Sequence, residues 1–246
     1  MAGPPRSRPA GFVRTVVQAA VRPARRNLLH WASWIVALSI ELAILILLRH
    51  EEIYPWELEV ARHLQSVPGK QYVFDVTSTL TNTLSIPFLL LFLVITAAVF
   101  IWGERIAAAV LLLSFPLHVL AQFPKALIDR PRPSSDFPGI EGVGGVQSFP
   151  SGHAEYVVTF YGFLAVILMM RARSWRSRSI IFLVWLVFAL ATGFGRVALG
   201  RHWPIDVLVS YVVGLGLLSG LVWLHSALSA GAAPGGEGRL SGQRRA

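Results

Sequence analysis

The stretch SFPSGHAEY, residues 148–156, stands at the head of a long apolar segment. It brings two serines, a glycine, a histidine and a glutamate to the point where an apolar helix would meet water. Polar and charged groups are costly to desolvate unless they are paired or used, so we expect them to serve a function at a membrane surface. The rest of the chain indicates which function.

The composition is that of a membrane protein. Of the 246 residues, 54% are hydrophobic and only 14% are charged, which is far from the balance of a soluble domain. The absence of cysteine excludes disulfides, thiolate nucleophiles and cysteine-ligated metals. The net charge of +9 comes almost wholly from arginine, and in a membrane protein it reports topology more often than nucleic-acid binding.

The apolar runs predict an all-α, polytopic membrane bundle of about six transmembrane helices, because each span needs about 20 residues. We expect a basic, disordered cytoplasmic arm over 1–27, a six-span membrane domain over 28–225 and a disordered tail over 226–246. A short amphipathic helix over 56–65 is expected to lie in the interface. The spans are expected at about 28–48, 84–102, 106–123, 154–170, 179–195 and 204–224.

The arginines predict the orientation. With a cytoplasmic amino terminus, the basic arm, the turn at 103–106, the loop at 171–178 and the tail all face the cytoplasm, as the positive-inside rule requires. Residues 49–83, 124–153 and 196–203 then face the other side. Glu41, in the middle of the first span, is expected to face the bundle interior.

Three polar clusters share this outer face. They are KALIDRPRP from Lys125, PSGH from Pro150 and GRVALGRHWPID from Gly195. Together they contain several cations, two histidines, a serine and aspartates, an inventory that suits a phosphate-like ligand. A basic loop attracted to anionic lipid headgroups is the alternative for the first cluster.

The third cluster has the most informative spacing. Asp206 follows His202 by four residues, so on a helix-like path both side chains project to one side. A carboxylate that holds one imidazole nitrogen leaves the other free as nucleophile or base, and Arg196 can return to the same site across a short turn. The alternative is an interfacial salt-bridge cluster in which Arg201 and the others snorkel.

The second cluster predicts a helix start. Ser151 occupies the expected N-cap position, and the amides of Gly152 and His153 would be unpaired in the first turn, at the positive end of the helix dipole. Such amides can seat a phosphate, and His153 can donate a proton. An ordinary capped helix with a surface histidine is the alternative.

In order and spacing, these residues resemble the type 2 phosphatidic acid phosphatase superfamily, which is related to the vanadium haloperoxidases. The signature of that superfamily is Lys, six residues, Arg-Pro; then Pro-Ser-Gly-His; then Ser-Arg, five residues, His, three residues, Asp. A soluble vanadium-dependent peroxidase shares the anion cradle but fits the expected spans and short length poorly. The matching positions are Lys125 with Arg132-Pro133, Pro150 to His153, and Arg196, His202 and Asp206.

The resemblance implies a role for each matching residue. His202 would attack phosphorus to give a phosphohistidine, with Asp206 orienting it, and His153 would protonate the leaving oxygen. The scheme requires no metal and no cofactor. The phosphoryl oxygens would be held by Lys125, Arg132, Arg196 and the amides of Ser151 and Gly152.

Three positions fall outside the signature. Gly195 stands where the superfamily has serine, which removes one hydroxyl donor. Glu155 follows His153 by two residues, where it would raise the pKa of His153, bind a headgroup or simply face water. Arg130 is expected to pair with Asp129 or to reach a second phosphate.

The expected function is an integral membrane lipid phosphatase acting at the extracytoplasmic face of a bacterial inner membrane. Its substrate would be undecaprenyl diphosphate, phosphatidate or phosphatidylglycerol phosphate, and nucleic acid is not an expected partner. Two alternatives remain: a phosphotransferase that passes the phosphoryl group to another lipid or sugar, and an inactive relative that binds or transports phospholipid, which Gly195 alone favours.

Overall fold

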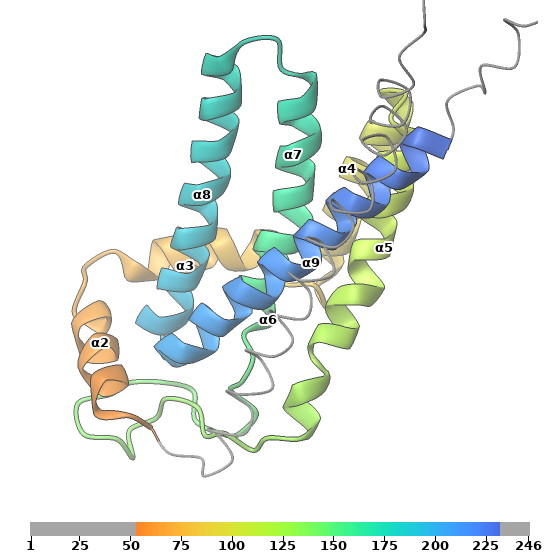
Figure 1. Ribbon diagram of the computed structural model, residues 1–246. Coiled ribbons are helices and arrows are strands. Elements are labelled where there is room, and N and C mark those ends of the chain that lie inside the picture. The colour runs from red at the N-terminus through yellow and green to blue at the C-terminus, as the bar shows by residue number, and fades with distance from the viewer. Residues whose placement is uncertain (1–52, 232–246) are drawn as a thin grey trace, which may run out of the picture.

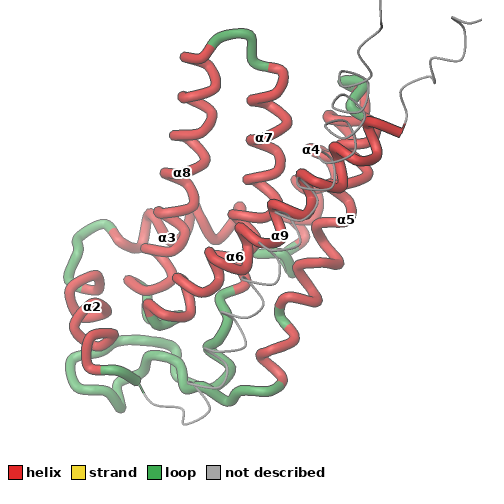
Figure 2. Tube along the Cα trace, viewed as in Figure 1, coloured by secondary structure: helices red, strands yellow, loops and turns green. Residues whose placement is uncertain are grey.

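The computed structural model describes residues 53–231, and this part of the chain consists of helices and loops without a strand (Figures 1 and 2). A 3₁₀ turn, η2, spans Phe123–Ala126, and a π-helical segment, η3, spans Val157–Tyr161. The α-helices are α2 (Pro55–Gln65), α3 (Lys70–Thr81), α4 (Ile86–Ile101), α5 (Arg105–Ala121), α6 (Gly152–Tyr156), α7 (Gly162–Arg171), α8 (Trp175–Ala198) and α9 (Pro204–Gly231).

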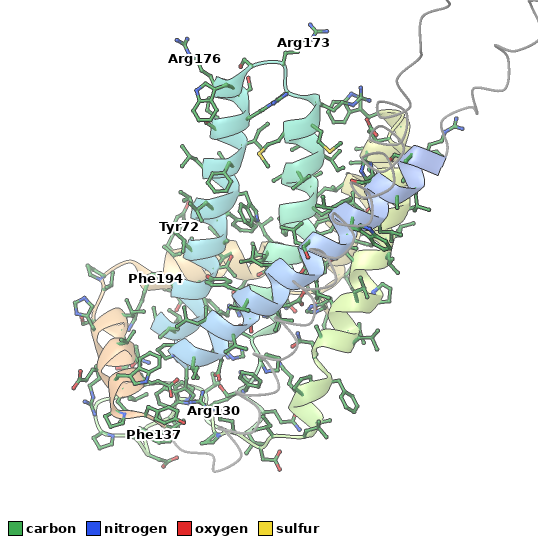
Figure 3. All side chains as sticks on the ribbon, in the orientation of Figure 1. Tyr72, Arg130, Phe137, Arg173, Arg176 and Phe194 are labelled. Carbon is green, nitrogen blue, oxygen red and sulfur yellow. The ribbon has the colours of Figure 1, made fainter. Side chains whose placement is uncertain are left out.

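The helices form two hairpins joined by α9. Helices α4 and α5 pair through the turn at 102–104, and α7 and α8 pair through the turn at 172–174, while α9 packs against α5, α7 and α8 (Figure 1). The long loop 127–151 and α2 lie together at one end of the bundle. Arg173 and Arg176 lie at the opposite end from Arg130 and Phe137 (Figure 3).

Four stretches of helix in the described residues are long and apolar enough to cross a membrane. They run over Arg105–Ala126, Gly152–Arg171, Trp175–Ala198 and Pro204–Ala230. Helices α3 and α4, which meet at an angle of 59°, make a fifth if they count as one span. The expected first span at 28–48, with Glu41 and the basic arm, lies outside the described residues, so the total of about six stays a prediction.

Helix α2 confirms the short helix expected at 56–65, whereas α3 was not expected. The sequence of α3, KQYVFDVTSTLT, has no long apolar run, and its threonines hydrogen-bond back into the helix, as Thr77 Oγ1 does to the carbonyl of Val73 at 2.8 Å. Its burial comes from α8, which crosses it (Figure 1). Local periodicity could not predict a helix whose partner is more than 100 residues away.

The main core is aromatic and forms where α4, α5 and the fourth span meet. Tyr156 and Phe160 stack with ring centroids 5.3 Å apart, and Phe88 and Phe92 pack edge-on or tilted against them. Such pairs add about 0.5–1.5 kcal/mol each beyond the burial of their area. The core therefore holds the π-helical segment and the residues immediately before it in place.

Helix α9 is longer than expected. It continues to Gly231, so residues 226–231, which the sequence assigned to a disordered tail, are helical. The segment contains alanine, leucine and serine, all compatible with a helix. The expected end near residue 224 is wrong for this reason.

Gly200 lies in the turn between α8 and α9, and we predict that substituting it destabilises the protein. Its φ is +57°, and a Cβ there would lie 2.1 Å from the carbonyl oxygen of Glu141. We expect Gly200→Ala to cost the roughly 1–3 kcal/mol of a left-handed non-glycine residue and the displacement of the loop in addition. Thermal unfolding in detergent measures this.

The control is Gly69→Ala. Gly69 also has a positive φ, +76°, but nothing lies within 4 Å of its added Cβ. The Tm of the Gly69→Ala variant should therefore fall less than the Tm of the Gly200→Ala variant. Equal decreases in Tm for the two variants would show that the close contact between Gly200 and the Glu141 carbonyl does not contribute to stability.

Candidate active site

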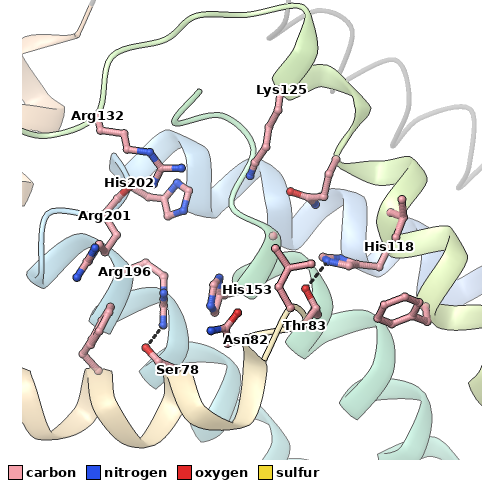
Figure 4. A pocket seen from close by; sticks show the side chains of 16 residues that line it. Ser78, Asn82, Thr83, His118, Lys125, Arg132, His153, Arg196, Arg201 and His202 are labelled. Carbon is pink, nitrogen blue, oxygen red and sulfur yellow. Dashed lines mark hydrogen bonds between the residues drawn. The ribbon is translucent and has the colours of Figure 1, made fainter. Parts of the chain in front are cut away.

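Six of the residues singled out in the sequence line one cavity at the α2 end of the bundle. The cavity has a volume of about 620 Å³ (Figure 4). It lies between the carboxyl-terminal ends of α5 and α8, the start of α6, the turn before α9 and helix α3. The six residues are Lys125, Arg132, Gly152, His153, Arg196 and His202.

His202 is held by a backbone carbonyl. Its Nδ1 lies 2.6 Å from the carbonyl oxygen of Ser148. A carbonyl oxygen can only accept, so Nδ1 carries the proton and the neutral ring keeps its lone pair on Nε2. The side chain is 5% exposed, and the residue lines the cavity. The geometry presents an unprotonated nitrogen to whatever the cavity binds.

Asp206 supports His202 less directly than the sequence suggested. Its Oδ2 is 3.7 Å from His202 Nδ1, too long for a hydrogen bond. The same oxygen accepts hydrogen bonds from Ser148 Oγ at 2.5 Å and from the Trp203 amide at 2.9 Å. Asp206 therefore fixes the residue whose carbonyl orients the imidazole and adds a negative charge behind the ring.

Arg130 corrects a second expectation. It contacts neither Asp129 nor the cavity but lies fully buried between two carboxylates. Its Nη1 donates to Asp206 Oδ1 at 2.5 Å and its Nη2 to Glu57 Oε2 at 2.6 Å. Glu57 also accepts from the Ile205 amide at 3.2 Å, so α2 is tied to the first turn of α9.

Glu57 is a residue that sequence reasoning missed. Placed in a short interfacial helix, it looked like an exposed charge of α2, yet it is 0% exposed. Its position in the first turn of α2, where it accepts from the Tyr54 amide at 3.3 Å, is the one local difference from Glu59, which is exposed. Its burial comes from the long-range contacts with Arg130 and the Ile205 amide.

We expect Glu57→Gln to destabilise the protein and to loosen Asp206. Breaking one side of a buried ion pair typically costs about 3–5 kcal/mol, because the remaining charge stays desolvated. Thermal unfolding should show a clear loss for this variant and almost none for the control Glu59→Gln on the same helix. A Tm equal to that of the control would contradict a structural role for the Glu57–Arg130 pair.

The PSGH segment leaves its serine free. Ser151 stands at the expected N-cap position of α6, but its hydroxyl does not cap the helix. Its amide donates to Ser210 Oγ at 2.7 Å, while its own Oγ is buried without a partner among the described residues. Ser151 does not line the cavity, so Gly152 and His153 are the residues of this segment that reach it.

Four cations line the cavity. Lys125 Nζ donates to the Pro150 carbonyl at 2.5 Å, and Arg132 Nη1 to the Arg201 carbonyl at 2.7 Å, while Arg196 Nη2 contacts the hydroxyl of Ser78. The fourth is Arg201, which the sequence offered only as part of a snorkelling cluster. Among residues 53–231 these cations have no carboxylate partner within salt-bridge distance, so they are free to bind an anion.

Phe74 of α3 forms the floor beneath two of these arginines. The guanidinium carbons of Arg196 and Arg201 lie 4.4 and 5.3 Å from its ring centroid. Gly195 explains why α3 can come so close, because a Cβ there would be 3.1 Å from the Phe74 Cα. A serine at 195 would press on α3, and Ser78 supplies a hydroxyl at this end of the cavity instead.

Glu155 does not face water, because it is 1% exposed. Its hydrogen-bond partners are His118 and Thr159 rather than His153. Thr159 Oγ1 donates to its Oε1 at 2.6 Å, and His118 Nδ1 contacts its Oε2. His118 belongs to α5, a segment whose sequence we interpret only as an apolar membrane span.

His202 should remain neutral far below the usual histidine range. Burial lowers the pKa of His202 to about 4, and Lys125 and Arg132 act in the same direction, whereas Asp206 opposes them. The nucleophilic lone pair is therefore present above about pH 4 and is lost as the pH falls through that value. The measurement is a titration of the ring by NMR in protein labelled with ¹⁵N-histidine.

His202→Ala identifies the resonance in that titration. A ring that titrates near its ordinary value of 6.5 would contradict the burial of His202 behind the cation cluster.

Within residues 53–231 no group of three or more His, Asp or Glu side chains converges in a way that could hold a metal ion. Metal independence itself stays a prediction, since the described residues are only part of the chain.

The described residues form a helical membrane protein in which a histidine and several cations line one cavity, as expected for a phosphatase of the family that the motifs resemble. The comparison with known families gives the same assignment. The family model of the PAP2 superfamily matches residues 105–229, slightly more than half of the chain. The chain belongs to this superfamily.

Individual relatives are distant. A PA-phosphatase related-family protein of Dictyostelium discoideum is 36% identical over 76 residues, which are 29% of this chain and only 21% of the relative. The chain thus spans about a fifth of the curated relative that it matches.

Two solved structures share the fold. The first transmembrane PAP2 type phosphatidylglycerolphosphate phosphatase from Bacillus subtilis aligns with a TM-score of 0.55 and 24% identity, over 80% of this chain and 96% of that one. LpxE of Aquifex aeolicus aligns with a TM-score of 0.50 and 22% identity, over 70% and 97%.

Proposed function

We propose that this protein is a membrane lipid phosphatase that works through a phosphohistidine on His202. One observation carries the proposal: the ring of His202, with Nδ1 engaged by the Ser148 carbonyl, lines a cavity shared with four cations that have no carboxylate partner in the described part of the chain. Such cations stabilise the charge spread over the oxygens of a transferring phosphoryl group. Nδ1 stays protonated throughout, so Nε2 is the attacking atom.

The reaction has two steps. His202 Nε2 attacks phosphorus, the bond between phosphorus and the ester oxygen breaks, and His153 gives its proton to the leaving oxygen. Water, deprotonated by His153, then attacks the phosphohistidine and releases phosphate, which restores both histidines. Asp206 stabilises the positive charge that develops on the ring.

The lining of the cavity supports a lipid substrate. Besides its polar groups it contains Phe115, Val119 and Leu84, and the last two are 56% and 90% exposed. An apolar rim of this kind lets an acyl or prenyl chain remain in the bilayer while the phosphate binds to the cations inside the cavity. Candidate substrates are undecaprenyl diphosphate, phosphatidate and phosphatidylglycerol phosphate.

The proposed setting is the extracytoplasmic face of a bacterial inner membrane, with a cytoplasmic amino terminus. The distribution of charge supports this orientation, because Arg173 and Arg176 lie at the end of the bundle opposite the cavity (Figure 3). Basic turns of this kind remain cytoplasmic.

His202→Ala tests the function. With the protein in detergent and excess EDTA, release of phosphate from the three candidate lipids should fall on the order of 10⁴-fold, as expected for loss of the nucleophile. The matched control is His63→Ala, which removes an exposed histidine of α2 outside the cavity and should leave turnover unchanged.

Ordinary turnover by His202→Ala would overturn the phosphohistidine scheme. Loss of wild-type activity in EDTA would overturn metal independence. Consumption of the lipid without matching free phosphate would favour a phosphotransferase instead.

A further inference from the structure

The cavity extends well beyond the phosphate-binding residues. On one side of His153 lie Arg132, Arg196 and Arg201, and on the other lie His118 and Thr83 (Figure 4). Gln122 lines the same cavity. His118, Thr83 and Gln122, which we call the polar annex, contain no signature residue and have no part in the proposed chemistry.

The geometry of the proposed displacement at phosphorus places the leaving group near the polar annex. In an in-line displacement the nucleophile and the leaving oxygen are on opposite sides of phosphorus. His202 lies with the arginines, and His153 would protonate the leaving oxygen. Atoms attached to that oxygen therefore extend past His153, away from His202.

The amide of Gln122 is the strongest indication of a ligand. Both its Oε1 and its Nε2 are buried without a hydrogen-bond partner within residues 53–231. A Cβ on Gly152 would lie 2.9 Å from that Oε1, so the amide sits directly against the helix start that bears Ser151 and His153. Leaving such a group unpaired is unfavourable, and a bound oxygen atom would supply the missing hydrogen bond.

His118 is a second polar group of the annex, and its partner Glu155 can balance a positive charge on its ring. Its Nδ1 contacts Glu155, and its Nε2 lies 3.2 Å from Thr83 Oγ1. Glu155 is buried and its other oxygen is taken by Thr159, so the carboxylate remains beside the annex. Even with a fully protonated His118, the annex and Glu155 together carry no net positive charge.

From these observations we infer that the polar annex binds an uncharged leaving group that carries a free hydroxyl next to the scissile ester, such as a glycerol that is not fully acylated. A plain alkyl or prenyl chain would leave the Gln122 amide unpaired. A second phosphate would bring negative charge toward Glu155, away from the arginines. The inference rests on the proposed function and selects among its candidate substrates.

Three synthetic lipids with the same chain test this selection: hexadecylglycerol phosphate with one free hydroxyl, hexadecyl phosphate and hexadecyl diphosphate. The wild type should show its highest kcat/KM for the first. Gln122→Leu should lower that value by about 5–10-fold, the effect of one lost hydrogen bond, and change hexadecyl phosphate by less than about 2-fold. Gln71→Leu, on the exposed face of α3 and outside the cavity, is the control.

Glu155→Gln tests the charge argument. It keeps the shape of the side chain but removes its charge, so the kcat/KM for the diphosphate should rise at least about 5-fold relative to hexadecylglycerol phosphate. This second variant reports on specificity through a ratio of substrates, which a uniform loss of folded protein would not move.

Equal losses on the glycerol and alkyl lipids in Gln122→Leu, or a wild-type preference for the alkyl or diphosphate lipid, would overturn the inference while leaving the phosphatase intact. Absence of His202-dependent release from all three lipids would overturn the proposed function, and the inference with it.

Discussion

The buried guanidinium of Arg130 is the contact on which the rest of the site depends. It joins Glu57 of α2 to Asp206 of α9, and all three side chains are inaccessible to water. A charge in that position is tolerable only with both carboxylates in place. Through Asp206 the same network fixes Ser148, and the Ser148 carbonyl determines which nitrogen of His202 remains free.

Helix α3 has a comparable effect on the other wall. By crossing α8 at Gly195 it places Phe74 beneath two arginines and Ser78 against one of them. These contacts hold the guanidinium groups of Arg196 and Arg201 in the cavity without neutralising them. The absence of serine at 195 is thus linked to the close approach of α3 and does not by itself indicate an inactive relative.

The two ends of the cavity differ in charge, and this difference bears on substrate choice. Cations gather around His202, whereas the region around His118 is balanced by the buried Glu155. Glu155 lies in α6, two residues before the π-helical segment that contains its partner Thr159, and such segments are frequent at functional sites. The aromatic core packed on that segment keeps the carboxylate in position.

The sequence by itself determined the helical class, the positions of most apolar helices and the signature residues, because hydrophobic runs and motif spacing are local properties. It could also indicate that Lys125, His153 and His202 share one face, since span ends alternate between two surfaces. Only the tertiary structure decided that Glu57 pairs with Arg130, 73 residues away, and Glu155 with His118, 37 residues away. A charged side chain has the same local pattern whether it meets water or a distant partner, so long-range packing alone distinguishes the two.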